Sequence, residues 1–160
     1  MIQDPVALIS EFRDAMKDLG LACGEIQHET QPAPHRPHGL PAGKCALYIF
    51  SLSQGYGEHS PAGAGRVLKV GRAGPNSNAR FQSQHYELGR ALSTLAATLI
   101  TSTILWHYLG IIELRSEQVG DWIRANTDRD NFYFDSKDNN ILAQCEKYTR
   151  GRLGPVFEGG

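Results

Sequence analysis

Two apolar segments separated by a glycine-rich loop constrain the fold of this chain more than any other feature. Residues 45–53, CALYIFSLS, are rich in aromatic and aliphatic side chains and predict a buried strand. Residues 66–72, RVLKVGR, predict a second strand. The segment between them, QGYGEHSPAGAG, is rich in glycine and predicts a flexible loop. We therefore expect an antiparallel hairpin with a long connection.

Helical patterns dominate the rest of the chain. Asp4 and Pro5 suit the cap and first residue of a helix over residues 5–19. Apolar residues recur along it at helical spacing: Val6, Ile9, Phe12, Met16 and Leu19. Further helices are predicted over residues 76–86, over 91–100 with Leu92, Leu95 and Leu99 on one face, over 116–127 with Ser116 as cap, and over 139–152 with Asp138 as cap.

The order of these elements predicts the fold class. Residues 131–135, NFYFD, alternate as a strand does, whereas the apolar residues 104–114 fit either a helix or a strand. Strands and helices do not alternate strictly, as they would in a doubly wound sheet. We therefore predict an α+β fold in which helices flank a small antiparallel sheet.

A proline-rich segment divides the chain. Residues 28–43, HETQPAPHRPHGLPAG, predict a linker or an extended surface strap. We accordingly predict an N-terminal part, residues 1–43, and a main domain, residues 44–160. The N-terminal helix is expected to pack on the main core, with docking to a partner as the alternative.

Charge and composition limit the classes of function. The formal net charge of −1 argues against a strongly basic nucleic-acid-binding domain. Positive charge nevertheless gathers over residues 66–90, where Glu87 is the single acid against Arg66, Lys69, Arg72, Arg80 and Arg90. No apolar run approaches the roughly 18 residues of a membrane span, and the start lacks the pattern of a signal peptide. Three cysteines without a C-x-x-C motif favour a cytoplasmic location.

Common catalytic and metal-binding motifs are absent from the sequence. No G-x-G-x-x-G opens a helix after a strand, and neither a P-loop nor G-x-S-x-G occurs. Cys23, His28, His35 and His38 match no zinc spacing, and a solvated strap is the preferred interpretation. Glu146 lies near the apolar stripe of the last helix, so its carboxylate needs solvent, a partner or a metal. From local sequence, an ion pair with Arg150 is the simplest solution.

Four segments, taken in order, resemble the GIY-YIG nucleases. They are ALYIF (46–50), LKVGRA (68–73), ARFQSQHY (79–86) and LAQCEKYTRGRLGPVFEG (142–159). The resemblance covers residues 44–159 and rests on the ordered combination of short motifs. It implies that Tyr48 is the first motif's tyrosine and Gly71 the second motif's glycine. It also makes Arg80 the helix arginine and Glu146 the metal-binding glutamate.

The chain departs from the family pattern at several positions. Ala46 and Leu47 replace Gly-Ile, Lys69 stands where the second tyrosine is usual, and Glu158 stands near the usual asparagine. His85 follows Arg80 by five residues where four is common. We include His85 and Lys69 with Tyr48, Arg80 and Glu146 in the predicted catalytic set.

The resemblance implies a Mg²⁺- or Mn²⁺-dependent endonuclease that hydrolyses DNA in defence, restriction or repair. Tyr48 would orient or activate water, and because a phenol is a poor base at neutral pH it would need a nearby cation such as Lys69. Arg72, Arg80 and Lys69 would contact phosphate, and Glu146 would bind the metal. Specificity would need a homodimer, a partner protein on residues 1–43 or the inserted loops. The alternative is an inactive relative that binds nucleic acid or a partner protein.

Overall fold

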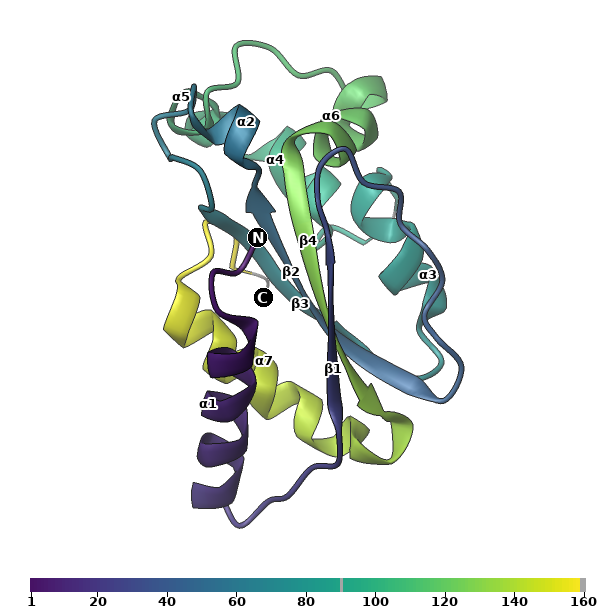
Figure 1. Cartoon of the computed structure of the whole chain (residues 1–160). Coiled ribbons are helices and arrows are strands. Elements are labelled where there is room, and N and C mark those ends of the chain that lie inside the picture. Colours follow the sequence, from purple (N-terminus) through teal and green to yellow (C-terminus); the bar gives the residue numbers. More distant parts are fainter. Residues whose placement is uncertain (90, 159–160) are drawn as a thin grey trace.

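A four-stranded antiparallel sheet forms the centre of the protein (Figure 1). The computed structural model describes residues 1–89 and 91–158, so Arg90 of the basic cluster lies outside them. The strands follow the order β1-β4-β2-β3 and span Ile26–Gln31 (β1), Lys44–Leu52 (β2), Val67–Ala73 (β3) and Thr127–Asp135 (β4). The predicted hairpin is formed by β2 and β3, and the predicted α+β class with an antiparallel sheet is confirmed.

Helices cover both faces of the sheet and give three layers (Figure 1). One face carries α1 (Pro5–Asp18) and α7 (Leu142–Leu153). The other carries α3 (Asn78–Gln82), α4 (Leu95–Thr101), α5 (Trp106–Leu109) and α6 (Val119–Asn126). The short α2 (Gln54–Gly57) follows β2, and 3₁₀ turns span Gln84–Tyr86, Thr103–Leu105, Ser116–Gln118 and Ser136–Ile141.

Residues 45–50 of strand β2 are apolar, and both faces of the strand are buried. Tyr48 and Phe50 point into the cluster formed with α3, α4 and α6. Leu47 and Ile49 point into the cluster formed with α1 and α7. Alternate residues of a strand face opposite sides, so a central strand between two helical layers favours a continuous apolar run over an alternating pattern.

More residues lie in the strands of the sheet than the sequence predicts. β1 begins at Ile26 and includes residues 28–31, which the sequence predicts as part of the strap. β4 begins at Thr127 rather than at Asn131, because the polar run TDRDN is buried in the sheet. Asp130 accepts hydrogen bonds from the Ile2 amide (2.7 Å), His28 Nε2 (2.8 Å) and Thr30 Oγ1 (2.7 Å). Such partners, distant in sequence, make burial of a polar strand tolerable.

Several helix boundaries differ from the predicted ones. In α1 the buried residues are Leu8, Phe12 and Met16, so the helix packs on the core as expected, but Val6 and Leu19 are exposed. α4 begins at Leu95 rather than at residue 91, which leaves Leu92 exposed before it. Neither Ser116 nor Asp138 caps a helix. Asp138 instead accepts the Gly24 amide at 3.0 Å.

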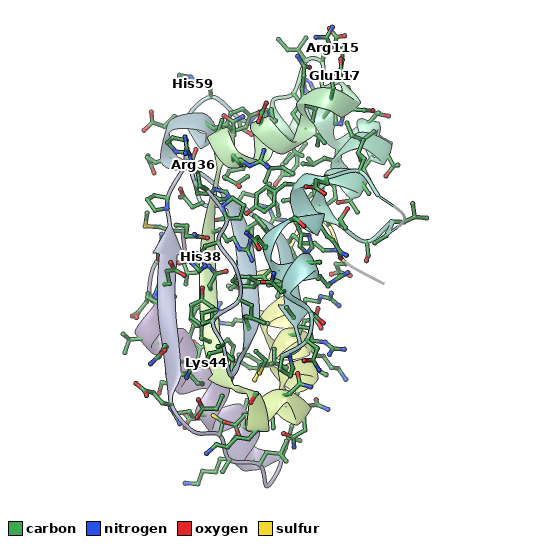
Figure 2. All side chains as sticks on the ribbon, turned by 90° about the vertical axis from the view of Figure 1, so that its right-hand side faces the viewer. Arg36, His38, Lys44, His59, Arg115 and Glu117 are labelled. Carbon is green, nitrogen blue, oxygen red and sulfur yellow. The ribbon has the colours of Figure 1, made fainter. Side chains whose placement is uncertain are left out.

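The segment between β1 and β2 lies across the face that carries α3. Figure 2 shows His38 between Arg36 and Lys44 on this side of the molecule. His38 Nε2 lies 2.9 Å from the Glu29 carboxylate, and the Leu40 amide donates to Asn78 Oδ1 of α3 at 2.8 Å. These contacts connect residues 32–43, the part of the predicted strap (28–43) that lies outside β1, to β1 and α3.

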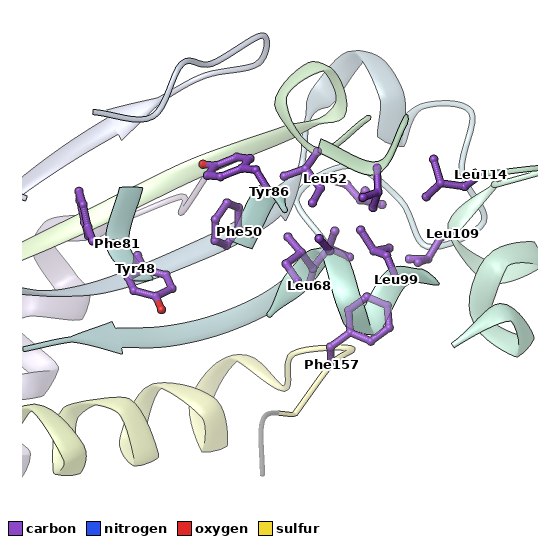
Figure 3. Packing of buried hydrophobic residues seen from close by; sticks show 14 of the residues in the cluster. Tyr48, Phe50, Leu52, Leu68, Phe81, Tyr86, Leu99, Leu109, Leu114 and Phe157 are labelled. Carbon is purple, nitrogen blue, oxygen red and sulfur yellow. The ribbon is translucent and has the colours of Figure 1, made fainter. Parts of the chain in front are cut away.

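The residues after α7 return to the sheet. The Val156 and Phe157 amides donate to the Val67 and Leu68 carbonyls at 3.1 and 2.9 Å. The Phe157 ring joins the cluster around Tyr48 and Phe50, where Figure 3 shows it beside Leu99. The outer edge of β3 is therefore partly paired by residues of the same chain.

Gly151 offers a test of the α7 assignment. It is exposed in the last part of the helix, and an added Cβ would meet no atom within 4 Å. Gly151→Ala is therefore expected to raise the free energy of unfolding by about 0.5–1 kcal/mol, measured by urea denaturation. Gly120→Ala in α6 is the matched control, because its Cβ would lie 2.5 Å from the Tyr86 carbonyl oxygen. A loss of stability at both positions would contradict the assignment.

Candidate functional site

Tyr48 lies at the centre of the predicted site. Its side chain is fully buried, and its hydroxyl lies 2.6 Å from His85 Nε2. Figure 3 shows the hydroxyl turned away from Phe81, at one end of the apolar cluster. Gly71 is opposite Tyr48 in the β2–β3 ladder, and a Cβ there would lie 2.7 Å from the hydroxyl oxygen. Glycine at position 71 therefore lets the tyrosine ring lie across β3.

The tautomer of His85 follows from its second hydrogen bond. The Leu95 amide donates to His85 Nδ1 at 3.0 Å, so the proton of the neutral ring is on Nε2 and is donated to the Tyr48 oxygen. Burial first, and then the cations Arg129 and Arg80, hold the pKa of His85 well below its usual 6.5. His85 is therefore a neutral donor that favours negative charge on the Tyr48 oxygen.

The Tyr48 hydroxyl proton has a weak acceptor within the protein. Among the described residues, the acceptor for this proton is the Arg72 carbonyl oxygen, at 3.5 Å from the hydroxyl oxygen. Burial raises the pKa of Tyr48, whereas the charges of Arg80 and Arg129 lower it. A proton acceptor or a further cation beside this oxygen would therefore shift Tyr48 towards phenolate.

Arg129 is a buried cation that the sequence did not identify. Its guanidinium carbon lies 4.3 to 6.0 Å from the ring centroids of four aromatic residues, namely Tyr48, Phe50, Phe81 and Tyr86. It donates to Asn131 Oδ1 (2.9 Å), the Tyr86 hydroxyl (3.1 Å) and the Phe81 carbonyl (2.7 Å). No carboxylate pairs with it in the described part of the chain. Arg129 thus places a fixed positive charge beside Tyr48.

Lys69 is buried in β3 rather than turned to solvent. It is opposite Phe50 in the ladder and therefore on the same sheet face as Tyr48, on the neighbouring strand. Its side chain is 1% exposed, and Nζ has no hydrogen-bond partner among residues 1–89 and 91–158. Burial, followed by the charges of Arg150 and Arg80, lowers the pKa of Lys69 to about 8. A buried ammonium without a partner calls for an anion.

Glu146 approaches this cluster from α7. The predicted ion pair with Arg150 is present, with Nη2 2.8 Å from Oε1. A second ion pair, from Arg72 Nε to Oε2, is also 2.8 Å long. Arg80 on α3 makes a long hydrogen bond to Ser93 Oγ at 3.4 Å, and its charge acts on Tyr48, Lys69 and His85. The five predicted catalytic residues therefore gather around one edge of the sheet.

The candidate site, formed by Tyr48, Lys69, Arg80, His85, Glu146 and the arginines near them, carries more positive than negative charge. Glu146 is its single carboxylate, against Lys69, Arg80, Arg150, Arg72 and Arg129. Arg150 Nε is also buried without a partner within the described residues. This excess suits a ligand that brings negative charge and several acceptor oxygens, as a phosphate group does.

A divalent cation would fit this site best together with an anionic substrate. Among the described residues no three His, Cys, Asp or Glu side chains gather as a metal-binding group. Mg²⁺ keeps several waters and often takes one or two carboxylates plus phosphate oxygens, so Glu146 suffices if the ligand is anionic. The unpartnered Lys69 ammonium indicates such an anion.

The other predicted residues lie apart from this cluster. Glu158, at the position of the usual asparagine, is exposed after Phe157. The strap histidines bond separately: His28 to Asp130, His35 to Tyr86 and Thr127, and His38 to Glu29. The sequence did not predict Arg129 as a site residue. Its aromatic neighbours come from β2, α3 and the turn after α3, and no local sequence pattern connects them to Arg129.

Comparisons of the chain with protein-family models, curated proteins and solved structures found no match. Within the described residues, no helix has both the length and the apolar character that a membrane span needs.

Proposed function

We propose that this protein is a divalent-cation-dependent endonuclease that hydrolyses phosphodiester bonds in DNA. The observation that carries the proposal is the buried Lys69 ammonium, which lacks a partner in the described structure and is acted on by the charges of Arg150, Arg80 and Glu146. A phosphate oxygen would supply the missing partner. The likeness of the ordered motifs to the GIY-YIG nucleases supports DNA as the source of that phosphate.

Each side chain of the candidate site has a separate role in the proposed reaction. Arg80 and Lys69 hold the phosphate and stabilise the charge that builds on its oxygens during attack. Tyr48 orients the attacking water and accepts its proton as phenolate, while His85 Nε2–H donates to the Tyr48 oxygen and stabilises that charge. Glu146 would hold Mg²⁺ or Mn²⁺, which when bound neutralises charge on the phosphoryl oxygens.

Lys69 is a cation where the family's usual residue is a tyrosine. With a pKa of about 8, it is mainly the ammonium at neutral pH. It lies on the same sheet face as Tyr48, on the neighbouring strand, where it can hold a phosphate oxygen. The substitution of lysine for the usual tyrosine is therefore compatible with an active site.

The proposal is tested with purified protein on plasmid, linear duplex and single-stranded DNA. We expect the wild type to cut DNA with Mg²⁺ or Mn²⁺ and not with EDTA. Glu146→Gln and Tyr48→Phe, which keep size and packing, are expected to lower the cleavage rate by about 100-fold or more. Glu117→Gln, at an exposed ion pair with Arg115, is the matched control and is expected to cut normally.

Two results would contradict the proposal. One is a wild-type protein that cuts none of these substrates, and the other is a Glu146→Gln variant that cuts as fast as the wild type. If DNA is bound but not cut, the chain is the inactive binding protein instead. In that case the affinity is expected to fall with salt concentration, because the cations would contact phosphates.

A further inference from the structure

The two oxygens of Glu146 are both held by arginines. Arg72 Nε lies 2.8 Å from Oε2, and Arg150 Nη2 lies 2.8 Å from Oε1. The glutamate side chain is 14% exposed, so these pairs are only partly screened by water. A divalent cation on this carboxylate would lie close to two guanidinium groups and would be repelled by both. One arginine must therefore move before Glu146 can bind a cation without that repulsion.

Arg72 is the arginine that is free to move. Its side chain is 49% exposed and extends from edge strand β3, whereas that of Arg150 is 27% exposed. Arg150 is one helical turn from Glu146 on α7 itself, and its Nε is buried. Figure 1 shows α7 packed beside β3, so the Arg72–Glu146 pair joins two separate elements.

We propose that Arg72 is a latch on Glu146 that the cation and the substrate release together. The proposal rests on the proposed nuclease function. In the free protein Arg72 neutralises Glu146, and in the complex the cation takes the carboxylate while the Arg72 guanidinium passes to a phosphate oxygen. Gly71, next to Arg72, lies against the Tyr48 hydroxyl, so a phosphate at Tyr48 is within reach of this strand.

The latch couples the two ligands. A phosphate that captures Arg72 exposes Glu146 to the cation, and a cation that displaces Arg72 frees it for the phosphate. Each ligand therefore strengthens binding of the other, by the same factor. The free protein, in contrast, binds the cation more weakly than Glu146 alone would allow.

The first test measures Mn²⁺ binding by electron paramagnetic resonance, without DNA. Arg72→Gln is expected to tighten Mn²⁺ binding roughly two- to fivefold, the range of a partly exposed ion pair. Glu146→Gln is expected to remove this binding. Arg115→Gln is the matched control, because it removes an exposed arginine that is paired with Glu117. Arg115 lies at the opposite end of the molecule from Lys44 in Figure 2. This variant is expected to leave Mn²⁺ affinity unchanged.

The second test measures affinity for a short DNA duplex with EDTA or with Ca²⁺. Arg72→Gln is expected to weaken DNA binding with Ca²⁺ and to have little effect with EDTA, where Arg72 stays on Glu146. An equal loss under both conditions would make Arg72 an ordinary phosphate contact and overturn the latch.

The outcomes separate the latch from the nuclease proposal. If Mn²⁺ binding depends on Glu146 but Arg72→Gln leaves it unchanged or weaker, the latch alone is wrong. If Mn²⁺ binding does not depend on Glu146, the metal role of Glu146 and the latch both fail.

Discussion

Replacing Lys69 with methionine is expected to stabilise the fold and at the same time to abolish DNA cleavage. Lys69 is 1% exposed, and its buried ammonium has no hydrogen-bond partner in the described residues, so burial of this charge opposes folding. Methionine fills a similar volume without the charge. We expect the free energy of unfolding at pH 7 to rise by about 1–2 kcal/mol, measured by urea denaturation. A residue retained at a cost in stability is typical of a functional site.

The pH dependence gives this prediction a second readout. The pKa of Lys69 is about 8 in the folded state, below the ordinary 10.5 expected for the unfolded chain. The unfolded state therefore binds the proton more tightly, and stability rises with pH between these two values. The advantage of Lys69→Met is expected to be full below pH 8 and to shrink as the pH approaches 10.5. A gain that does not change with pH would show that charge burial is not its cause.

Lys147→Met supplies the matched control. Lys147 is an exposed lysine on α7, and its replacement is expected to change stability by less than about 0.5 kcal/mol and to leave cleavage intact. If Lys69→Met cuts DNA at the wild-type rate, Lys69 has no part in the chemistry.

Replacing Arg129 with alanine is expected to lower the free energy of unfolding by about 3 kcal/mol or more. The substitution leaves a cavity and removes the donor from three acceptors: the Phe81 carbonyl, the Tyr86 hydroxyl and Asn131 Oδ1. Arg129→Met separates volume from charge. It fills much of the space and relieves the cost of burying a cation, so it is expected to lose less stability than Arg129→Ala.

Thermal or urea denaturation at neutral pH measures both Arg129 variants. Arg115→Ala, at an exposed arginine, is the control and is expected to stay within about 0.5 kcal/mol of the wild type. An Arg129→Ala protein as stable as the wild type would mean that the burial cost of this cation cancels its contacts.

The fold class could be predicted from the sequence because the apolar patterns that define it are local. The β2–β3 hairpin and α1 follow from runs whose periodicity is visible within a few residues. The strand β1 and the first half of β4 were missed for the opposite reason. Asp130 is stable inside the sheet only because Ile2, His28 and Thr30 donate to it, and no local pattern reveals these distant donors.

The candidate site remains a prediction, and its arrangement could not be foreseen from the sequence. The ordered motifs selected Tyr48, Lys69, Arg80, His85 and Glu146, and the structure brings these residues together. The fixed tautomer of His85 and the second ion pair of Glu146 depend on Leu95 and Arg72, which come from other elements. The protonation of His85 and the pairing of Glu146 therefore depend on the three-dimensional arrangement and could not be predicted from residue type.

The pairing of residues 156 and 157 with β3 also bears on self-association. An exposed sheet edge can pair with the edge of a second molecule and start ordered aggregation. At the start of β3 two backbone carbonyls already accept the Val156 and Phe157 amides. Further along the same edge, Arg72 places a charged side chain where a second strand would have to approach. Two paired carbonyls and a charged side chain on this edge are features that disfavour strand pairing with a second molecule.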